Sequence, residues 1–175
     1  MNNRKLRRRG QRRPKIAHDD LCVVAGKWLR RNGVIDYSHE LDNRRPMPLV
    51  TVKNHLSYNN EHPDVIGFSS DSRYTTVIEV KTSRSDFLKD SKKSHRVNIG
   101  MGDLRYYCCP EGLITPDELP WRWGLLYYDG KRIWVVSESL AFISVDRKSE
   151  RYLLGYYLRY SNAFLANRIN LRRKK

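Results

Sequence analysis

The chain has 175 residues, of which 39% are hydrophobic, and its formal net charge is +15. This length suits a single domain with a buried core. No apolar run approaches the roughly 18 residues that a membrane span needs, and no apolar region follows the basic start as it does in a secretory signal. We therefore expect a cytoplasmic protein that does not enter a membrane.

The three cysteines, Cys22, Cys108 and Cys109, show neither a metal-ligand spacing nor a disulfide framework. We interpret them as small apolar residues in a reducing compartment. The five histidines show no ligand spacing either; they are His18, His39, His55, His62 and His95. On spacing alone, neither residue type indicates a metal site.

The positive charge is concentrated at the two ends. Residues 1–15 contain eight Arg or Lys and no acid, residues 168–175 contain five more, and the segment between them has 21 basic and 19 acidic residues. We expect a disordered basic arm at 1–14, one folded domain at 15–170 and a basic tail at 171–175. Such arms bind polyanions with salt-sensitive affinity, and neither is a persuasive amphipathic helix, which favours nucleic acid over a membrane surface. The candidate contact residues are Arg7, Arg8, Arg9, Arg12, Arg13, Lys92, Lys93, Arg172 and Arg173.

The first predicted elements are a helix at 15–31 and a strand at 34–41. The helix has apolar residues about one turn apart and is ended by Asn32-Gly33. Its apolar stripe consists of Ala17, Leu21, Val24 and Trp28. The stretch that follows contains Pro and Asn, and its residues 51–56 fit either a short strand or part of a loop.

Two antiparallel strands are predicted at 62–67 and 77–81, because apolar and β-branched residues flank their charged positions. The polar segment between them is suited to a tight turn. A turn centred on Asp71-Ser72 places Asp64 opposite Glu79. Apolar residues on both faces indicate interior strands that are covered on both sides.

The charged residues of these two strands indicate a metal site. Facing carboxylates repel each other, and a bound Mg2+ would reverse this, since hard divalent ions favour carboxylate oxygens. Lys81 follows Glu79 by two residues, so both side chains leave the same face, about 7 Å apart along the strand. With Asp64 they form a set typical of metal-assisted phosphodiester hydrolysis. The alternative is a turn residue at Asp64 and an ordinary solvated Glu-Lys pair.

Helices and strands continue in mixed order after these residues. The later elements are a helix at 83–97, a strand at 104–109, a helix start at 115–118, strands at 123–128 and 131–136, and a helix at 149–170. Ser83 and Asp86 match a capping box, Thr115 is a typical N-cap, and Asp129-Gly130 is a strong hairpin signal. The order α-β-β-β-α-β-β-β-α predicts a single mixed α/β structure.

Several runs resemble the PD-(D/E)xK nuclease superfamily. Pro63-Asp64 corresponds to the first half of its motif and Glu79-Val80-Lys81 to the second. The runs 78–90, 105–113 and 119–126 resemble the branch that includes the MmcB-like DNA-repair proteins. The resemblance implies a restriction-endonuclease-like mixed sheet flanked by helices, and a Mg2+- or Mn2+-dependent DNA endonuclease of repair or recombination. Because some relatives have lost catalysis, a catalytically inactive nucleic-acid-binding protein on the same scaffold is the alternative.

The resemblance also implies roles for individual residues. The implied metal ligands are Asp64, Glu79, the Val80 carbonyl and an acid from an upstream element. Glu40 is the first candidate for that acid, and Asp20 is the second. Lys81 would orient the attacking water, lower its pKa or steady the charge developing on the phosphate. DNA is the expected partner and the nucleoid the expected location, while a homodimer is left open.

Two further pairs have alternative interpretations. Asp86 and Asp90 lie one helical turn apart, and we interpret the first as a capping acid and the second as a partner of Lys93. In the alternative interpretation, Lys93 and its basic neighbours do not pair with these acids but guide a DNA strand. Trp121 and Trp123 lie in an expected loop, where stacking on a base is open to them, although core packing is expected for at least one.

A third hypothesis is an RNA- or ribosome-associated basic protein whose Glu79 and Lys81 are ordinary surface residues. It requires Asp64 and Glu79 to lie far apart in the fold. The separation of Asp64, Glu79 and Lys81 therefore distinguishes it from the nuclease hypothesis.

Overall fold

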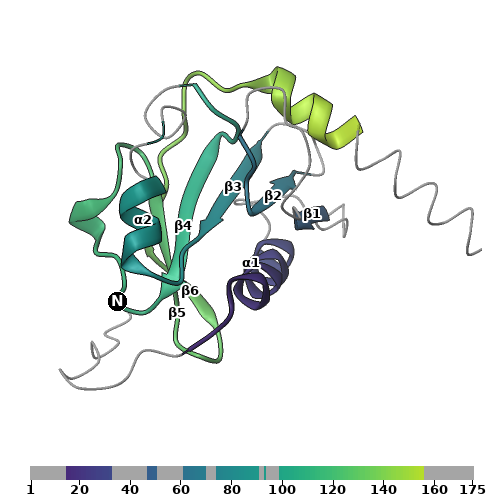
Figure 1. Ribbon diagram of the computed structural model, residues 1–175. Coiled ribbons are helices and arrows are strands. Elements are labelled where there is room, and N and C mark those ends of the chain that lie inside the picture. Colours follow the sequence, from purple (N-terminus) through teal and green to yellow (C-terminus); the bar gives the residue numbers. More distant parts are fainter. Residues whose placement is uncertain are drawn as a thin grey trace, which may run out of the picture.

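The computed structural model describes residues 15–32, 47–50, 61–69, 74–90, 93 and 99–155. Its elements are α1 (His18–Asn32), β1 (Met47–Val50), β2 (Val65–Phe68), β3 (Thr75–Val80), α2 (Arg84–Asp90), β4 (Leu104–Pro110), the 3-10 turn η1 (Pro116–Glu118), β5 (Gly124–Tyr128) and β6 (Ile133–Ser137), shown in Figure 1. Residues 147–155 are also helical. Within these ranges, no helix combines the length and the apolar character needed to cross a bilayer.

One six-stranded sheet contains all the strands, in the order β1-β2-β3-β4-β5-β6. The central strands β3, β4 and β5 are parallel, and the outer pairs β1-β2, β2-β3 and β5-β6 are antiparallel. The predicted α/β class, a mixed sheet flanked by helices, is therefore confirmed. Along the chain, the elements of the sheet and its two covering helices follow one another as α1-β1-β2-β3-α2-β4-β5-β6.

The two faces of the sheet are covered by different helices, as Figure 1 shows for α1 and α2. Side chains alternate between faces along a strand, so neighbouring residues of β3 enter different cores. The α1 core contains Leu21, Cys22, Ala25 and Leu29 with Val65, Ile78, Val80 and Cys108. The opposite face holds Phe87 of α2 with Tyr107, Leu125 and Tyr127, and Leu153 with Ile66, Val77 and Met101. All of β3 is buried, which confirms the predicted interior strand.

The apolar stripe predicted for the first helix was partly wrong. The buried apolar side chains of α1 are Leu21, Cys22, Ala25 and Leu29, whereas Ala17 is exposed and Val24 and Trp28 lie at the margin of the core. The difference follows from how α1 docks on β2. Gly67 has no side chain, and a Cβ added there would lie 2.6 Å from Leu29 Cδ2. The helix therefore seats Leu29 over this glycine, which turns the Leu29 side of the helix toward the sheet.

Local turn signals agree with the structure. Asp129 Oδ1 accepts the backbone N–H groups of Lys131 and Arg132 at 2.8 and 2.9 Å, and Gly130 has φ 98°, as the predicted hairpin requires. Ser83 Oγ accepts the Asp86 N–H at 3.3 Å at the start of α2. The hairpin and this helix start are confirmed.

Other boundaries differ from the prediction or were missed. The predicted helix start at 115–118 is only the single turn η1, because Pro120 follows at once and cannot continue a helix. β1 was missed, since Pro48 lowers the strand signal and is tolerated here at a sheet edge. Some predictions fall outside the described residues. They are the strands at 34–41 and 51–56, most of the predicted helix beyond residue 90, and the part of the last helix beyond residue 155.

Candidate functional site

Asp64 and Glu79 occupy facing positions on neighbouring strands. The ladder pairs Val65 with Ile78 and Ile66 with Val77, and the same register continued by one residue places Asp64 opposite Glu79. The predicted register is therefore confirmed. Asp64 Oδ2 accepts the Val80 N–H at 2.9 Å, which fixes the carboxylate at the end of β3.

Glu79 and Lys81 leave the same face of β3, as predicted. Lys81 Nζ lies 3.5 Å from Glu79 Oε2, and the two side chains are only 5% and 3% exposed, respectively. The Lys81 N–H donates to the Cys108 carbonyl at 2.9 Å and so continues the ladder with β4 beyond the end of β3. The backbone therefore holds Lys81 as rigidly as a strand residue.

Three carboxylates surround the Lys81 ammonium. Besides Glu79, Asp90 Oδ1 lies 3.5 Å and Asp86 Oδ2 3.8 Å from Nζ. Burial works against the charged amine, but Glu79, Asp90 and Asp64 outweigh it and raise the pKa of Lys81. Lys81 is therefore a cation at neutral pH, which excludes it as a general base in this arrangement.

Asp90 has a larger role than the sequence indicated. Its predicted contact with Lys93 is confirmed at 2.7 Å. The carboxylate is also buried, accepts the Tyr107 hydroxyl at 3.0 Å and pairs with Lys81. The signal was its position three residues after Phe87, on the side of α2 that packs on the sheet. Asp86, by contrast, is half exposed.

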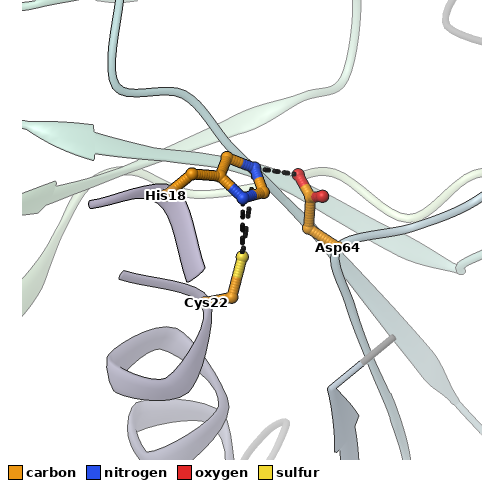
Figure 2. Close-up of side chains that lie close together, drawn as sticks. All are labelled: His18, Cys22 and Asp64. Atoms are coloured by element: carbon orange, nitrogen blue, oxygen red, sulfur yellow. Dashed lines mark hydrogen bonds and ion pairs between the residues drawn. The ribbon is translucent and has the colours of Figure 1, made fainter. Parts of the chain in front are cut away.

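A second cluster, which we call the α1 triad, consists of His18, Cys22 and Asp64 (Figure 2). His18 Nε2 lies 3.3 Å from Asp64 Oδ2, and Cys22 Sγ lies 3.5 Å from His18 Nδ1 and 4.0 Å from Nε2. The ligand atoms that the three residues offer all lie within 4.8 Å of one another, so they are able to hold a metal ion. This arrangement alone gives no identity for the metal.

The prediction that the cysteines and histidines have no ligand spacing was wrong for His18 and Cys22. They lie four residues apart on α1, one helical turn, and so share a side of the helix. That spacing was readable in the sequence. The third member was not, because Asp64 joins them only through the docking of α1 beside β2.

The charges of the α1 triad depend on one another. The hydrogen bond with Asp64, and then that with Cys22, raise the pKa of His18 to about 11. Burial opposes ionisation of Asp64, yet the bond from His18 holds the pKa of its carboxyl below the ordinary value. Burial raises the pKa of the Cys22 thiol. At neutral pH the triad is thus an imidazolium-carboxylate pair beside a protonated thiol.

The remaining predicted residues are scattered or outside the described part of the chain. Outside it lie Glu40, Arg7, Arg8, Arg9, Arg12, Arg13, Lys92, Arg172 and Arg173. Asp20 is exposed in the first turn of α1, and Lys93 is 53% exposed. Trp123 is buried and stacks on Tyr107, with 4.5 Å between ring centroids, which confirms core packing for one tryptophan, whereas Trp121 is 77% exposed.

Comparison with known proteins gives a fold and no function. No family model and no curated protein matches the chain. The chain is similar in structure to the SPO1766 protein of unknown function from Silicibacter pomeroyi, with a TM-score of 0.60 and 17% sequence identity. The similarity covers 89% of this chain and 94% of that one. At this identity the likeness concerns the fold alone.

Proposed function

We propose that the chain is a divalent-metal-dependent deoxyribonuclease. The observation that carries the proposal is the register of β2 and β3, which, continued by one residue, brings the backbone of Asp64 opposite that of Glu79, while Lys81 leaves the same face as Glu79. Facing carboxylates are unfavourable unless a cation lies near both. Lys81 meets part of this need, since it attracts Glu79 and also lowers the pKa of Asp64.

The donor set fits a hard divalent ion. Asp64 and Glu79 offer carboxylate oxygens, the ligands that Mg2+ and Mn2+ take in proteins. The Val80 carbonyl, which lies between Glu79 and Lys81 in the chain, and Glu40 are the proposed further ligands. Such an ion would polarise the scissile phosphate and lower the pKa of a bound water.

Lys81 acts in this proposal as a fixed positive charge. Its raised pKa keeps the amine protonated, so it donates hydrogen bonds to the attacking water or to the phosphate and removes no proton. Its carboxylate contacts at 3.5 to 3.8 Å are longer than a good charged hydrogen bond. A phosphate oxygen can therefore replace Asp86, the most exposed of these partners, at small cost.

DNA is the proposed substrate because of Lys93 and the positive charge at the two ends of the chain. Lys93, which is half exposed and pairs with Asp90, is the proposed contact for a strand that passes Lys81. The basic arms predicted at 1–14 and 171–175 would add contacts to phosphates without reading sequence. A repair or recombination role on the nucleoid is the corresponding cellular proposal.

The direct test is cleavage of labelled duplex, branched and single-stranded DNA with Mg2+ or Mn2+. We expect Glu79→Gln and Lys81→Met to lower the rate by roughly 100-fold or more. The matched controls are Asp117→Asn and Lys131→Met, which change exposed side chains on η1 and in the β5-β6 turn and should cut like the parent. Equal rates for all variants would contradict the proposed site.

A catalytically inactive nucleic-acid-binding protein is the second candidate. It is favoured by the three carboxylates around Lys81 and by the His18-Asp64 pair, because these contacts balance the charges without a metal ion. It predicts salt-sensitive DNA binding with no cleavage of any of the three substrates. The RNA- or ribosome-associated hypothesis requires Asp64 and Glu79 to lie far apart, whereas the register of β2 and β3, continued by one residue, supports neighbouring backbone positions for them.

A further inference from the structure

The α1 triad has the dimensions of a metal site. His18 Nε2 lies 3.3 Å from Asp64 Oδ2 and 4.0 Å from Cys22 Sγ, and the ligand atoms are all within 4.8 Å of one another. Ligand atoms around a tetrahedral Zn2+ are roughly 3.3 to 3.8 Å apart, from metal-ligand distances of about 2.0 to 2.3 Å. We propose that His18, Cys22 and Asp64 bind a thiophilic divalent cation of the Zn2+ class.

The chemistry of the donors selects the cation. Mg2+ takes oxygen ligands, whereas a site with one thiol sulfur, one imidazole nitrogen and one carboxylate oxygen suits Zn2+ and its neighbours. Cys22 and His18 supply the first two from adjacent turns of α1, and Asp64 supplies the third from the residue before β2. The triad therefore differs in selectivity from the oxygen ligands of the proposed nuclease site.

Neighbouring groups already orient two of the ligands. His18 Nδ1 lies 3.2 Å from Asp19 Oδ1, so Asp19 is placed to hold the ring with Nε2 directed at Asp64. Metal-binding histidines commonly donate their second N–H to a carboxylate in this way. The Val80 N–H donates to Asp64 Oδ2 and fixes that carboxylate as well. These neighbouring groups therefore hold the two ligands in a fixed orientation even without a bound ion.

The order Cys22-His18-Asp64 also matches a nucleophile, base and orienting acid, which is the alternative use of such a cluster. The surroundings of Cys22 speak against it. The sulfur belongs to the α1 core, where it is buried with Leu21 and Ala25. Burial raises the pKa of the thiol, whereas a reactive cysteine needs a lowered pKa and an accessible sulfur. The raised pKa does not prevent metal binding, because a cation displaces the thiol proton when it binds the sulfur. An organic substrate does not displace that proton.

Asp64 would belong both to the α1 triad and to the proposed nuclease site. If the proposed function is right, a thiophilic ion bound at the triad competes for Asp64 and inhibits cleavage. This consequence depends on the proposed function. Binding at the triad does not, because His18 and Cys22 have no part in the proposed reaction.

The test is a titration of the full chain with Co2+ under a reducing agent, read by the thiolate-to-cobalt charge-transfer band. We expect one equivalent of Co2+ to produce the band, Zn2+ to displace it and excess Mg2+ to leave it unchanged. Cys22→Ser and His18→Gln should abolish it. The controls are Cys109→Ala, on the opposite face of the sheet, and the exposed His62→Gln, both of which should keep it.

Asp19→Asn provides a graded test, since loss of an outer carboxylate typically weakens metal binding about 10- to 100-fold. Asp20→Asn, the adjacent exposed acid, should have the parent affinity. A band that survives Cys22→Ser or His18→Gln would overturn the proposal, and so would rapid alkylation of Cys22 in a protein that shows no band. Glu79→Gln should leave the band intact even if it abolishes cleavage. Failure of the nuclease proposal can therefore be distinguished from failure of the metal-binding proposal.

Discussion

The Lys81 ammonium and the Asp90 carboxylate form a buried ion pair, with 3.5 Å between Nζ and Oδ1. The pair joins the end of β3 to the end of α2. Tyr107 of β4 donates its hydroxyl to the other oxygen of Asp90 at 3.0 Å. Three elements that bound the candidate site are therefore tied together by one carboxylate.

Replacing Asp90 by Asn should destabilise the fold, because it leaves the Lys81 charge buried with fewer partners. Removing one member of a buried pair typically costs about 3 kcal/mol. The half-exposed Asp86 offers the matched control, since Asp86→Asn should cost less than about 1 kcal/mol. Urea unfolding of the two variants measures both values. Equal costs would mean that Asp90 does not have the structural role assigned to it.

Gly67→Ala should destabilise the docking of α1 on the sheet. The added Cβ would lie 2.6 Å from Leu29 Cδ2 in a packed core, and overpacking of this kind costs about 1 to 3 kcal/mol. Leu29→Ala leaves room for that Cβ, so the double variant should lose less stability than the sum of the two single changes. Gly155→Ala is the control, because its Cβ meets no described atom within 4 Å. Strict additivity in thermal or urea unfolding would contradict the proposed contact.

The predictions that succeeded depend on short stretches of chain. The polar segment between the two strands predicted the observed register of β2 and β3, and Asp129-Gly130 predicted the β5-β6 hairpin, because a tight turn leaves few ways to align its strands. Such features are encoded within about ten residues. They required no knowledge of how distant elements pack.

The features that were missed depend on packing between distant elements. His18 and Cys22 meet Asp64 only once α1 is docked, and its rotation is set by the fit of Leu29 over Gly67. Asp90 reaches Lys81 only once α2 lies on the sheet. Helical periodicity defines a broad apolar side and does not define which of its residues touches a given strand.

The pair of Glu118 and Arg84 should make stability depend on pH in acid. The bond from Arg84, and then those from Thr115, lower the pKa of Glu118 from 4.5 to about 2. A carboxyl with a lowered folded-state pKa contributes stability that is present above its unfolded value and is lost as the pH falls through its folded value. The stabilisation should therefore be complete above about pH 4.5 and disappear toward pH 2.

Glu118→Gln isolates this effect. Its midpoint of thermal unfolding should lie below that of the parent at neutral pH, and the difference should shrink between pH 4.5 and pH 2. Asp117→Asn changes the exposed neighbour and should keep the pH profile of the parent. A difference that stays constant through the acid range would show that Glu118 acts through packing and not through its charge.

Deleting residues 1–13 should weaken DNA binding for all sequences and flatten its dependence on salt. The segment contains seven Arg or Lys and no acid. Each phosphate contact that is lost should lower the slope of log affinity against log salt by roughly 0.9 on duplex DNA. A variant with a shuffled arm of the same composition should keep the parent slope, whereas one with its Arg and Lys changed to Gln should behave like the deletion. An unchanged slope after deletion would show that the arm does not contact phosphates, and the DNA contacts would then have to come from the rest of the chain, including the basic tail at 171–175.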